Sequence, residues 1–210
     1  SPHHTISAMG LTGGGRIPRP GEASLAHCGV LFLDELAEFP RNVLELLRQP
    51  IEDGEITIAR VNATVTYPAK FMLVAAMNPC PCGFYGDPYR ECICSPYQVQ
   101  KYLSKISGPL MDRIDLQIEA APVKFSDFES KETSDSASIR RNVENARSLQ
   151  LERYKNYKIF CNSQLTPGMM NRFCNLGKKE KLLVKEAFHK LKLSARAYNK
   201  ILKTSRTIAD

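Results

Sequence analysis

The sequence predicts an α/β part with a parallel sheet, followed by an all-α part. Two apolar runs, residues 29–34 and 71–78, have the unbroken hydrophobicity of strands buried on both faces of such a sheet. Beyond a charged stretch at 122–133, apolar residues recur at helical spacing. We therefore expect an α/β core over residues 1–125 and a helical domain over 126–210.

Each remaining element of the α/β part has its own local signal. The Gly- and Pro-rich residues 1–28 predict a long loop with one short helix at 23–27. In FPRNVLELLRQPIEDG, apolar residues at helical spacing predict a helix that ends at Gly54. The alternation over residues 55–67 predicts a β-hairpin. A helix near 97–106 and a third strand in the second half of GPLMDRIDLQIEA complete this part.

The sequence of the C-terminal part predicts four helices. The first covers about 135–156. The second has Thr166 as its N-cap, Pro167 at its first position and Gly177 as its C-cap. KKEKLLVKEAFHKLKL predicts the third, and the fourth starts after an N-cap at Ser194.

Charge is unevenly distributed along the chain. Residues 126–210 hold 18 basic and 9 acidic side chains, a net charge of +9, so residues 1–125 carry −2. A basic half suits a polyanion such as nucleic acid or a nucleotide, but it also suits a solvated, Lys-rich helical surface. The sequence has no run of about 18 apolar residues and no apolar leader. We expect a cytoplasmic protein that does not associate with a membrane.

Two acids, Asp34 and Glu35, directly follow the first apolar run. Carboxylates beside a buried strand are costly unless something compensates their charge, and Mg²⁺ can do so in a phosphate-hydrolysing site. The second apolar run ends in Asn78, which could orient water at the same place. Alternatively, the acids open a helix and Asn78 opens an Asn-Pro turn.

Several motifs together carry a family resemblance. GVLFLDEL, AAMNPCPCG, GPLMDRIDL and SARAYNKILKTSRTIAD, in this order, resemble AAA+ ATPases of the magnesium-chelatase-like group, and the match is closest to its competence-linked ComM/YifB family. SPHHTIS, GEASLAHCGVLFLDELAEF and LRQPIEDG are also similar to that family. The resemblance implies a P-loop NTPase core with a helical lid, ATP and Mg²⁺ as cofactors, and assembly into a ring, expected to be a homohexamer.

The resemblance also implies roles for five residues. Asp34 and Glu35 match the Walker B acids, and Asn78 matches sensor 1. Arg113 matches the arginine finger that reaches the nucleotide of a neighbouring subunit, and Arg196 matches sensor 2. Both arginines would neutralise charge that develops on the γ-phosphate.

For both arginines the sequence leaves a second interpretation open. Arg113 could form an ion pair with Asp112 or Asp115, and Arg196 could belong to a basic helix face.

The family's phosphate-binding loop, G-x-x-x-x-G-K-[ST], does not occur in the sequence. GLTGGGR has glycines but neither the Gly-Lys-Ser/Thr ending nor a preceding strand. In the family this loop lies upstream of the equivalent of Ser1. We therefore expect the chain to be part of a longer protein, and to bind ATP poorly and not hydrolyse it when alone.

Four cysteines cluster in CPCGFYGDPYRECIC, namely Cys80, Cys82, Cys92 and Cys94. Four thiolates suit a tetrahedral structural zinc site, although free thiols or a disulfide formed during handling remain alternatives. Cys28, Cys161 and Cys174 are expected to be small buried residues. His3 and His4 should point in opposite directions on an extended segment, so we expect no metal role for them.

The hairpin places Arg60 and Asn62 at its tip, where a basic or amide group could contact a phosphate backbone. In related proteins this hairpin and the Gly-rich stretch at 10–21 are expected to face the ring pore. A plain surface hairpin is the alternative.

The sequence thus predicts part of an ATP-hydrolysing ring motor acting on DNA, as a helicase or branch-migration motor in competence or recombination. One alternative is a motor for metal insertion into a tetrapyrrole. The other is a zinc-stapled, non-catalytic module for nucleic-acid binding or assembly.

Overall fold

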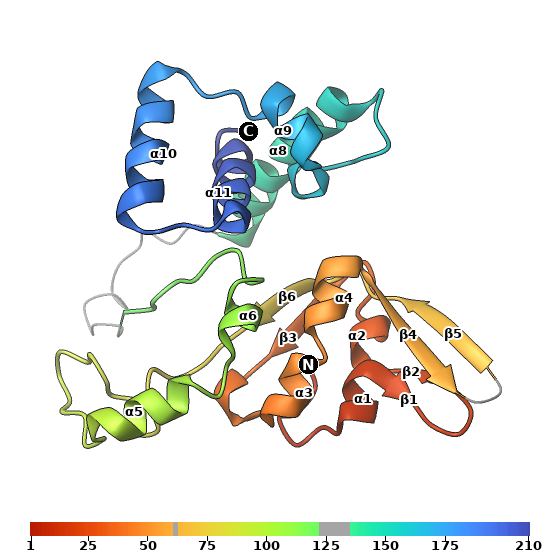
Figure 1. Cartoon of the computed structure of the whole chain (residues 1–210), viewed down its shortest axis with the longest axis vertical. Coiled ribbons are helices and arrows are strands. Elements are labelled where there is room, and N and C mark those ends of the chain that lie inside the picture. Colours follow the sequence, from red (N-terminus) through yellow and green to blue (C-terminus); the bar gives the residue numbers. More distant parts are fainter. Residues whose placement is uncertain (61–62, 122–134) are drawn as a thin grey trace. The chain divides into compact units, whose positions relative to one another are not determined.

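The computed structural model describes residues 1–60, 63–121 and 135–210 of the chain. By its internal contacts the chain divides into two compact units, Ser1–Ile118 and Glu119–Asp210 (Figure 1). Each unit contains its own cluster of buried apolar side chains, so each is described by itself. In the described parts, no helix has the length and hydropathy needed to cross a membrane.

A pair of parallel strands forms the centre of the first unit. β3 (Val30–Leu33) pairs with β6 (Met72–Ala75), as the two apolar runs predicted. Leu33 is fully buried, whereas Val30 and Met72, which face each other across the pair, are 56% and 65% exposed. The expectation of burial on both faces is therefore wrong, because no element of the described residues covers the second face.

The segment after β3 forms a short turn, η1 (Leu36–Glu38), and then two helices where one was predicted. α3 (Arg41–Glu45) and α4 (Arg48–Asp53) are separate pieces. Pro50 lacks the N–H that would bond to the carbonyl of residue 46, so the helical hydrogen-bond ladder is interrupted there. Gly54 ends α4 with a φ of +72°, as predicted.

Two antiparallel hairpins lie next to each other in this unit (Figure 1). The predicted hairpin is confirmed, with Glu55 opposite Pro68 and Arg60 opposite Ala63. A second, very small hairpin lies within the stretch that the sequence predicted to be a loop, and two short helices flank it. The elements of this region are α1 (Ala8–Thr12), β1 (Gly13–Gly14), β2 (Arg19–Pro20), α2 (Glu22–Leu25), β4 (Glu55–Arg60) and β5 (Ala63–Pro68).

Two further helices follow β6. α5 (Pro96–Leu103) starts with a capping box in which Ser95 and Gln98 each accept the other's backbone N–H, and α6 (Gly108–Met111) follows. The predicted third strand is not found in the described residues after α6. Ile118 there is 87% exposed and has no neighbouring strand to pair with, and a strand without a partner leaves its backbone groups unsatisfied.

The second unit is helical, as predicted, and its helices surround a small core of Tyr154, Leu165, Met170, Cys174 and Leu202. The predicted boundary between residues 125 and 126 lies outside the described residues. The elements of this unit are α8 (Ser136–Tyr154), η2 (Asn162–Gln164), α9 (Pro167–Phe173), α10 (Lys178–Lys190) and α11 (Ala195–Ile208).

Side-chain caps start two of these helices, with Asp135 capping α8 and Ser194 capping α11. Thr166 and Ser194 are N-caps as predicted, and the Ser194 hydroxyl accepts the N–H of Ala197. The predicted C-cap at Gly177 is wrong, because α9 ends at Phe173 with Cys174 as its C-cap, and Gly177 is instead the N-cap of α10. This leaves a short connection rather than a glycine-terminated turn.

A buried polar network links three segments of this unit. Asp210 accepts hydrogen bonds from Arg153 and from the amide of Asn162 at 2.8 Å each. The Asn162 side chain in turn accepts the Tyr154 hydroxyl proton at 2.6 Å. Because these groups are buried, each must be satisfied inside the protein, and the network ties α8 and η2 to the end of α11.

Candidate nucleotide and metal sites

Asp34 and Glu35 lie at the carboxyl end of β3, where the chain turns into η1. The Asp34 carboxylate accepts the backbone N–H of Glu35 at 2.9 Å. Glu35 has φ 52° and ψ 47°, a left-handed conformation that is uncommon for a residue with a side chain. The N–H of Leu36 then donates to the carbonyl of Ala76, so this turn is tied to the residues that follow β6.

Asn78 follows β6 and is exposed. Since β3 and β6 are parallel, their carboxyl ends lie at the same edge of the pair. The structure therefore brings Asp34, Glu35 and Asn78 to one edge, although 43 residues separate Glu35 from Asn78 in the sequence. Oxygen-rich side chains at such an edge have the donor chemistry that Mg²⁺ prefers.

His4 contacts Glu35, which sequence reasoning missed. The imidazole Nδ1 of His4 lies 3.0 Å from Glu35 Oε2. The rings of His3 and His4 are 4.0 Å apart, so the expectation that they point in opposite directions is wrong. The reason is a turn: the N–H of Ile6 donates to the carbonyl of His3, so the segment is not extended.

Arg113 is held within its own unit by Glu52 of α4. Its Nε and Nη2 both donate to Glu52 Oε2, and its Nη1 donates to the carbonyl of Pro109 at 2.6 Å. The Arg113 side chain is only 12% exposed. The ion pair with Glu52, 61 residues away, is not one that neighbouring sequence could have indicated.

Arg196 lies in the first turn of α11 and is exposed. A positive charge at a helix N-terminus opposes the helix dipole, so this position is electrostatically unfavourable for the helix. Arg196 belongs to the second unit, and the structure therefore does not relate it to Asp34 and Glu35.

Arg60 ends β4 and contacts the smaller hairpin. Its Nε donates to the carbonyl of Gly15 at 3.3 Å, and the Tyr67 hydroxyl donates to the carbonyl of Pro18 at 2.9 Å. Arg16 and Arg19 on that smaller hairpin are also exposed. Arginines from both hairpins thus belong to one packed region, whereas the other predicted contact residue, Asn62, lies outside the described residues.

The four clustered cysteines converge in space. Cys80 Sγ lies 3.4 Å from Cys82 Sγ and 3.7 Å from Cys92 Sγ, and all four sulfur atoms, including that of Cys94, lie within 4.8 Å of one another. A tetrahedral zinc with Zn–S distances of about 2.3 Å would separate its sulfur ligands by about 3.8 Å. The four residues therefore fit a tetrahedral metal ion.

The thiols influence one another strongly. The backbone N–H of Phe84 stabilises the Cys82 thiolate and, with the Cys80 thiol, lowers the pKa of Cys82 to about 6 against the effect of burial. A backbone hydrogen bond from Cys94 favours the Cys92 thiolate, but burial and the neighbouring sulfur atoms outweigh it and raise the pKa of Cys92 to about 12. Closely packed thiols cannot all ionise unless a cation compensates them.

The remaining cysteines only partly match expectation. Cys174 is buried and Cys161 is half-buried, but Cys28 is exposed. Cys28 has a φ of +58°, and its backbone N–H donates to the carbonyl of Lys70. Its position is thus set by the backbone at the start of β3 and not by burial of the thiol.

α5 connects the cysteine loop with the turn after β3. Lys105, just beyond α5, pairs with Glu38 of η1 at 3.2 Å. Burial raises the pKa of the Tyr102 hydroxyl, and the negative charges of Glu38, Cys80 and Glu35 raise it further. Tyr102 therefore lies close enough to both sites to experience their charges.

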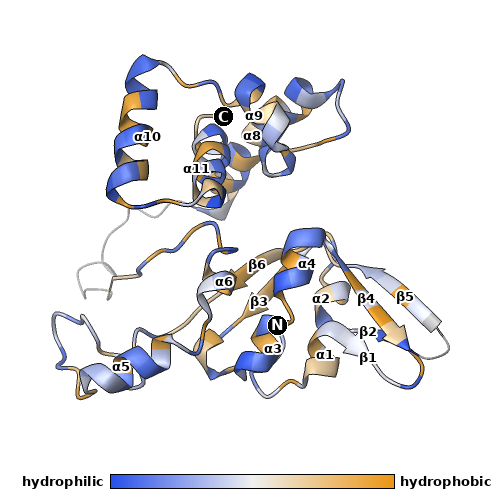
Figure 2. Ribbon diagram, viewed as in Figure 1, coloured by the Kyte–Doolittle hydropathy of each residue, from blue (hydrophilic) through white to orange (hydrophobic). Residues whose placement is uncertain are grey.

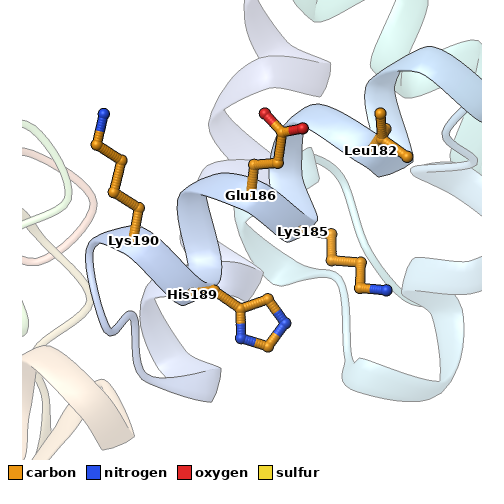
Figure 3. A pocket seen from close by; sticks show the side chains of 5 residues that line it. All are labelled: Leu182, Lys185, Glu186, His189 and Lys190. Carbon is orange, nitrogen blue, oxygen red and sulfur yellow. The ribbon is translucent and has the colours of Figure 1, made fainter.

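A surface hollow lies on α10 of the second unit. All the residues that line the hollow belong to α10, and their side chains point away from the axis of that helix (Figure 3). Figure 2 shows apolar residues among the hydrophilic ones along α10, and every side chain of this fully described helix is at least partly exposed. The lining residues are Leu182, Lys185, Glu186, His189 and Lys190.

Comparison with known proteins matches both units. The family model described as magnesium chelatase, subunit ChlI, matches residues 1–128, and the model of the ChlI C-terminal part matches residues 133–210. The whole chain is 47% identical to competence protein ComM of Haemophilus influenzae and 44% identical to YifB, an uncharacterized protein of Escherichia coli. The chain spans only 40% and 41% of the lengths of these two proteins.

A more distant match covers less of the chain. The 38 kDa magnesium-chelatase subunit of Cereibacter sphaeroides is 32% identical over 69 residues, which are 33% of this chain and 21% of that protein. The ChlI model implies an AAA+ fold. The chain therefore belongs to the magnesium-chelatase ChlI-like family of AAA+ ATPases, and it resembles ComM and YifB over its full length.

Proposed function

We propose that the chain is part of an ATP-hydrolysing ring motor that acts on DNA. The observation that carries this proposal is the parallel pairing of β3 with β6, which brings Asp34, Glu35 and Asn78 to one edge of the strand pair. An acid pair and an amide at this edge can serve water attack on a phosphate. Membership of the ChlI-like AAA+ family supports ATP as the substrate.

Each residue at this edge has a proposed task. Asp34 would hold Mg²⁺, which would supply positive charge beside the phosphates of ATP. Glu35 accepts a hydrogen bond from the attacking water and polarises it. Asn78 orients the same water through its amide. The phosphate-binding loop is not among the residues of this chain, so hydrolysis is proposed for the whole protein.

The two arginines would act in assembly and sensing. Arg113 is proposed to stabilise the γ-phosphate in a neighbouring subunit, which requires a ring, expected to be a hexamer. The pair with Glu52 would then have to rearrange, or Glu52 would hold the guanidinium ready for its target. Arg196 is proposed as sensor 2, and its unfavourable position at the start of α11 supports a role other than helix stability.

DNA is proposed as the substrate on three grounds. Arg60, Arg16 and Arg19 lie on two adjoining hairpins, and Arg60 is hydrogen-bonded to the smaller one. Residues 126–210 carry a charge of +9, which suits phosphate contacts. The relative ComM is named a competence protein, which agrees with an action on DNA.

The test is the ATPase rate of the whole protein with and without forked DNA. We expect DNA to stimulate ATP hydrolysis and Glu35→Gln to abolish it. Arg113→Ala should also abolish hydrolysis, but mixing this variant with wild-type subunits in one ring should restore part of the activity. Loss of salt-dependent DNA binding in a variant with Arg16, Arg19 and Arg60 replaced by Ala would support the hairpin contact. DNA binding that persists without any ATPase activity would support a non-catalytic module instead.

The match to a magnesium-chelatase subunit favours a second candidate function. In it, the same ATPase would drive metal insertion into a tetrapyrrole. An ATPase rate that is indifferent to DNA but rises in the presence of a tetrapyrrole-binding partner would favour this function over the first.

We further propose that Cys80, Cys82, Cys92 and Cys94 hold a structural zinc ion. The sulfur distances and the four-thiol donor set support it. With four protein ligands the metal has no open position for substrate, so its role is to close the loop that follows Asn78.

A further inference from the structure

His4 lies at the candidate catalytic edge although no motif assigns it a role. Its Nδ1 lies 3.0 Å from Oε2 of Glu35. We propose that His4 is a positioning residue that sets the orientation of the Glu35 carboxylate toward the attacking water. This inference rests on the proposed role of Glu35 in ATP hydrolysis.

Hydrogen bonds to nearby residues hold the backbone of Glu35, but they do not fix the position of its carboxylate. Its N–H is bound by the Asp34 carboxylate, and its carbonyl accepts the N–H of Glu38 at 2.7 Å. The next residue, Leu36, is bonded to the carbonyl of Ala76. These contacts fix the direction of the Cα–Cβ bond, yet the carboxylate is 55% exposed and sits on rotatable bonds.

The imidazole of His4 is itself held in place. Its ring meets the ring of Phe39 edge to face, with centroids 6.4 Å apart and planes at 75°. Phe39 directly follows η1 and is 2% exposed, so it is part of the core. The ring of His3 packs against the ring of His4, with their centroids 4.0 Å apart. A group anchored in this way loses little further freedom when it binds the carboxylate.

The contact leaves one carboxylate oxygen for water. Nδ1 of His4 faces Oε2 of Glu35, and this contact is attractive only when Nδ1 carries a proton. With Oε2 bound, Oε1 points in a defined direction. The orientation of the Glu35 carboxylate affects the rate of hydrolysis, and therefore kcat. It does not affect the binding of ATP, because other residues bind ATP.

Steady-state ATPase kinetics of the whole protein test the inference. His4→Ala should lower kcat about tenfold with little change in KM. His4→Asn should recover most of the activity, because its side-chain amide nitrogen takes the place of Nδ1. In a Glu35→Gln background, His4→Ala should cause no further loss, since both residues act through one group. His189→Ala, on an exposed helix of the second unit, should stay within about twofold of the wild type.

The outcomes separate this inference from the proposed function. If Glu35→Gln leaves turnover unchanged, the proposed function is wrong and the catalytic role of His4 falls with it. If Glu35→Gln abolishes turnover while His4→Ala leaves kcat within twofold, only the inference about His4 is overturned. A loss confined to KM, or losses that multiply in the double variant, would also overturn it.

A second measurement tests the contact without relying on activity. The chain has 4 histidines, so ¹⁵N resonances of labelled imidazoles can be assigned by single substitutions. We expect His4 to be in its Nδ1–H form and to lose that preference in Glu35→Ala. An unchanged tautomer in Glu35→Ala would show that Glu35 does not hold the ring.

Discussion

The Arg113–Glu52 pair joins the residue after α6 to α4, although the two side chains are far apart in the sequence. An arginine side chain that is only 12% exposed needs partners for its charged group, and Glu52 and the carbonyl of Pro109 accept its hydrogen bonds. Removing one partner of such a pair leaves the other insufficiently satisfied. The same pairing would decide how readily Arg113 could turn to a neighbouring subunit.

We therefore predict that Glu52→Ala lowers the free energy of unfolding of the first unit by about 2 kcal/mol, the scale of a lost charge-assisted hydrogen bond. Chemical denaturation of the chain, followed by a signal from the first unit, measures this. The matched control is Glu52→Gln, which keeps an acceptor of the same shape and should cost clearly less. Equal stability of Glu52→Ala and wild type would mean that the pair does not hold the first unit together.

At the scale of elements, the loop between β6 and α5 depends on its four cysteines. Few apolar side chains of this loop are buried; Cys80 is buried, whereas Tyr85, Tyr89 and Ile93 are more than half exposed. A loop without an apolar core needs another source of order, and a bound metal supplies it.

We predict one zinc ion per chain in protein purified under reducing conditions. Cys92→Ser should lose most of the zinc, whereas Cys28→Ser, at an exposed cysteine outside the cluster, should retain it. Elemental analysis gives the stoichiometry. Removal of the metal by a chelator should increase hydrogen exchange in α5 and leave α8 unaffected. A metal-free protein with a well-protected loop would contradict the prediction.

At the scale of the whole molecule, each of the two units contains a buried polar or ionic contact that links distant segments. In the second unit this contact is the network around Asp210, whose side chain is fully buried. Burial raises the pKa of the Asp210 carboxyl, but hydrogen bonds from Arg153 and Asn162 outweigh that effect and hold its pKa below the ordinary value of 3.8.

A carboxyl with a lowered pKa in the folded state adds stability that is fully present above its unfolded pKa and is lost as pH falls through the folded one. The second unit should therefore become less stable as pH falls from about 5 to about 2. In Asp210→Asn the second unit should be less stable at neutral pH, and its stability should change less over that range. Denaturation followed by a signal from the second unit, at several pH values, checks this. Parallel curves for the two proteins would contradict it.

Local sequence alone determined most elements of this protein. The parallel strands follow from unbroken apolar runs, the hairpin of β4 and β5 follows from alternating side chains, and the cap at Ser194 follows from a short-range hydrogen bond to Ala197. The cysteine cluster was also visible, because its members are close in sequence. The absence of the third strand among the described residues could not be predicted from local sequence, because a strand depends on a partner elsewhere in the chain.

Only the tertiary structure decided which groups meet at the candidate site. His4 lies 31 residues from Glu35, and Arg113 lies 61 residues from Glu52. Neither contact has a local signal, because each arises from the packing of separate elements. The sequence determined which chemical groups are present and on which elements they stand. The folded chain determined their partners, because hydrogen bonds and ion pairs act over a few ångströms in space regardless of distance along the sequence.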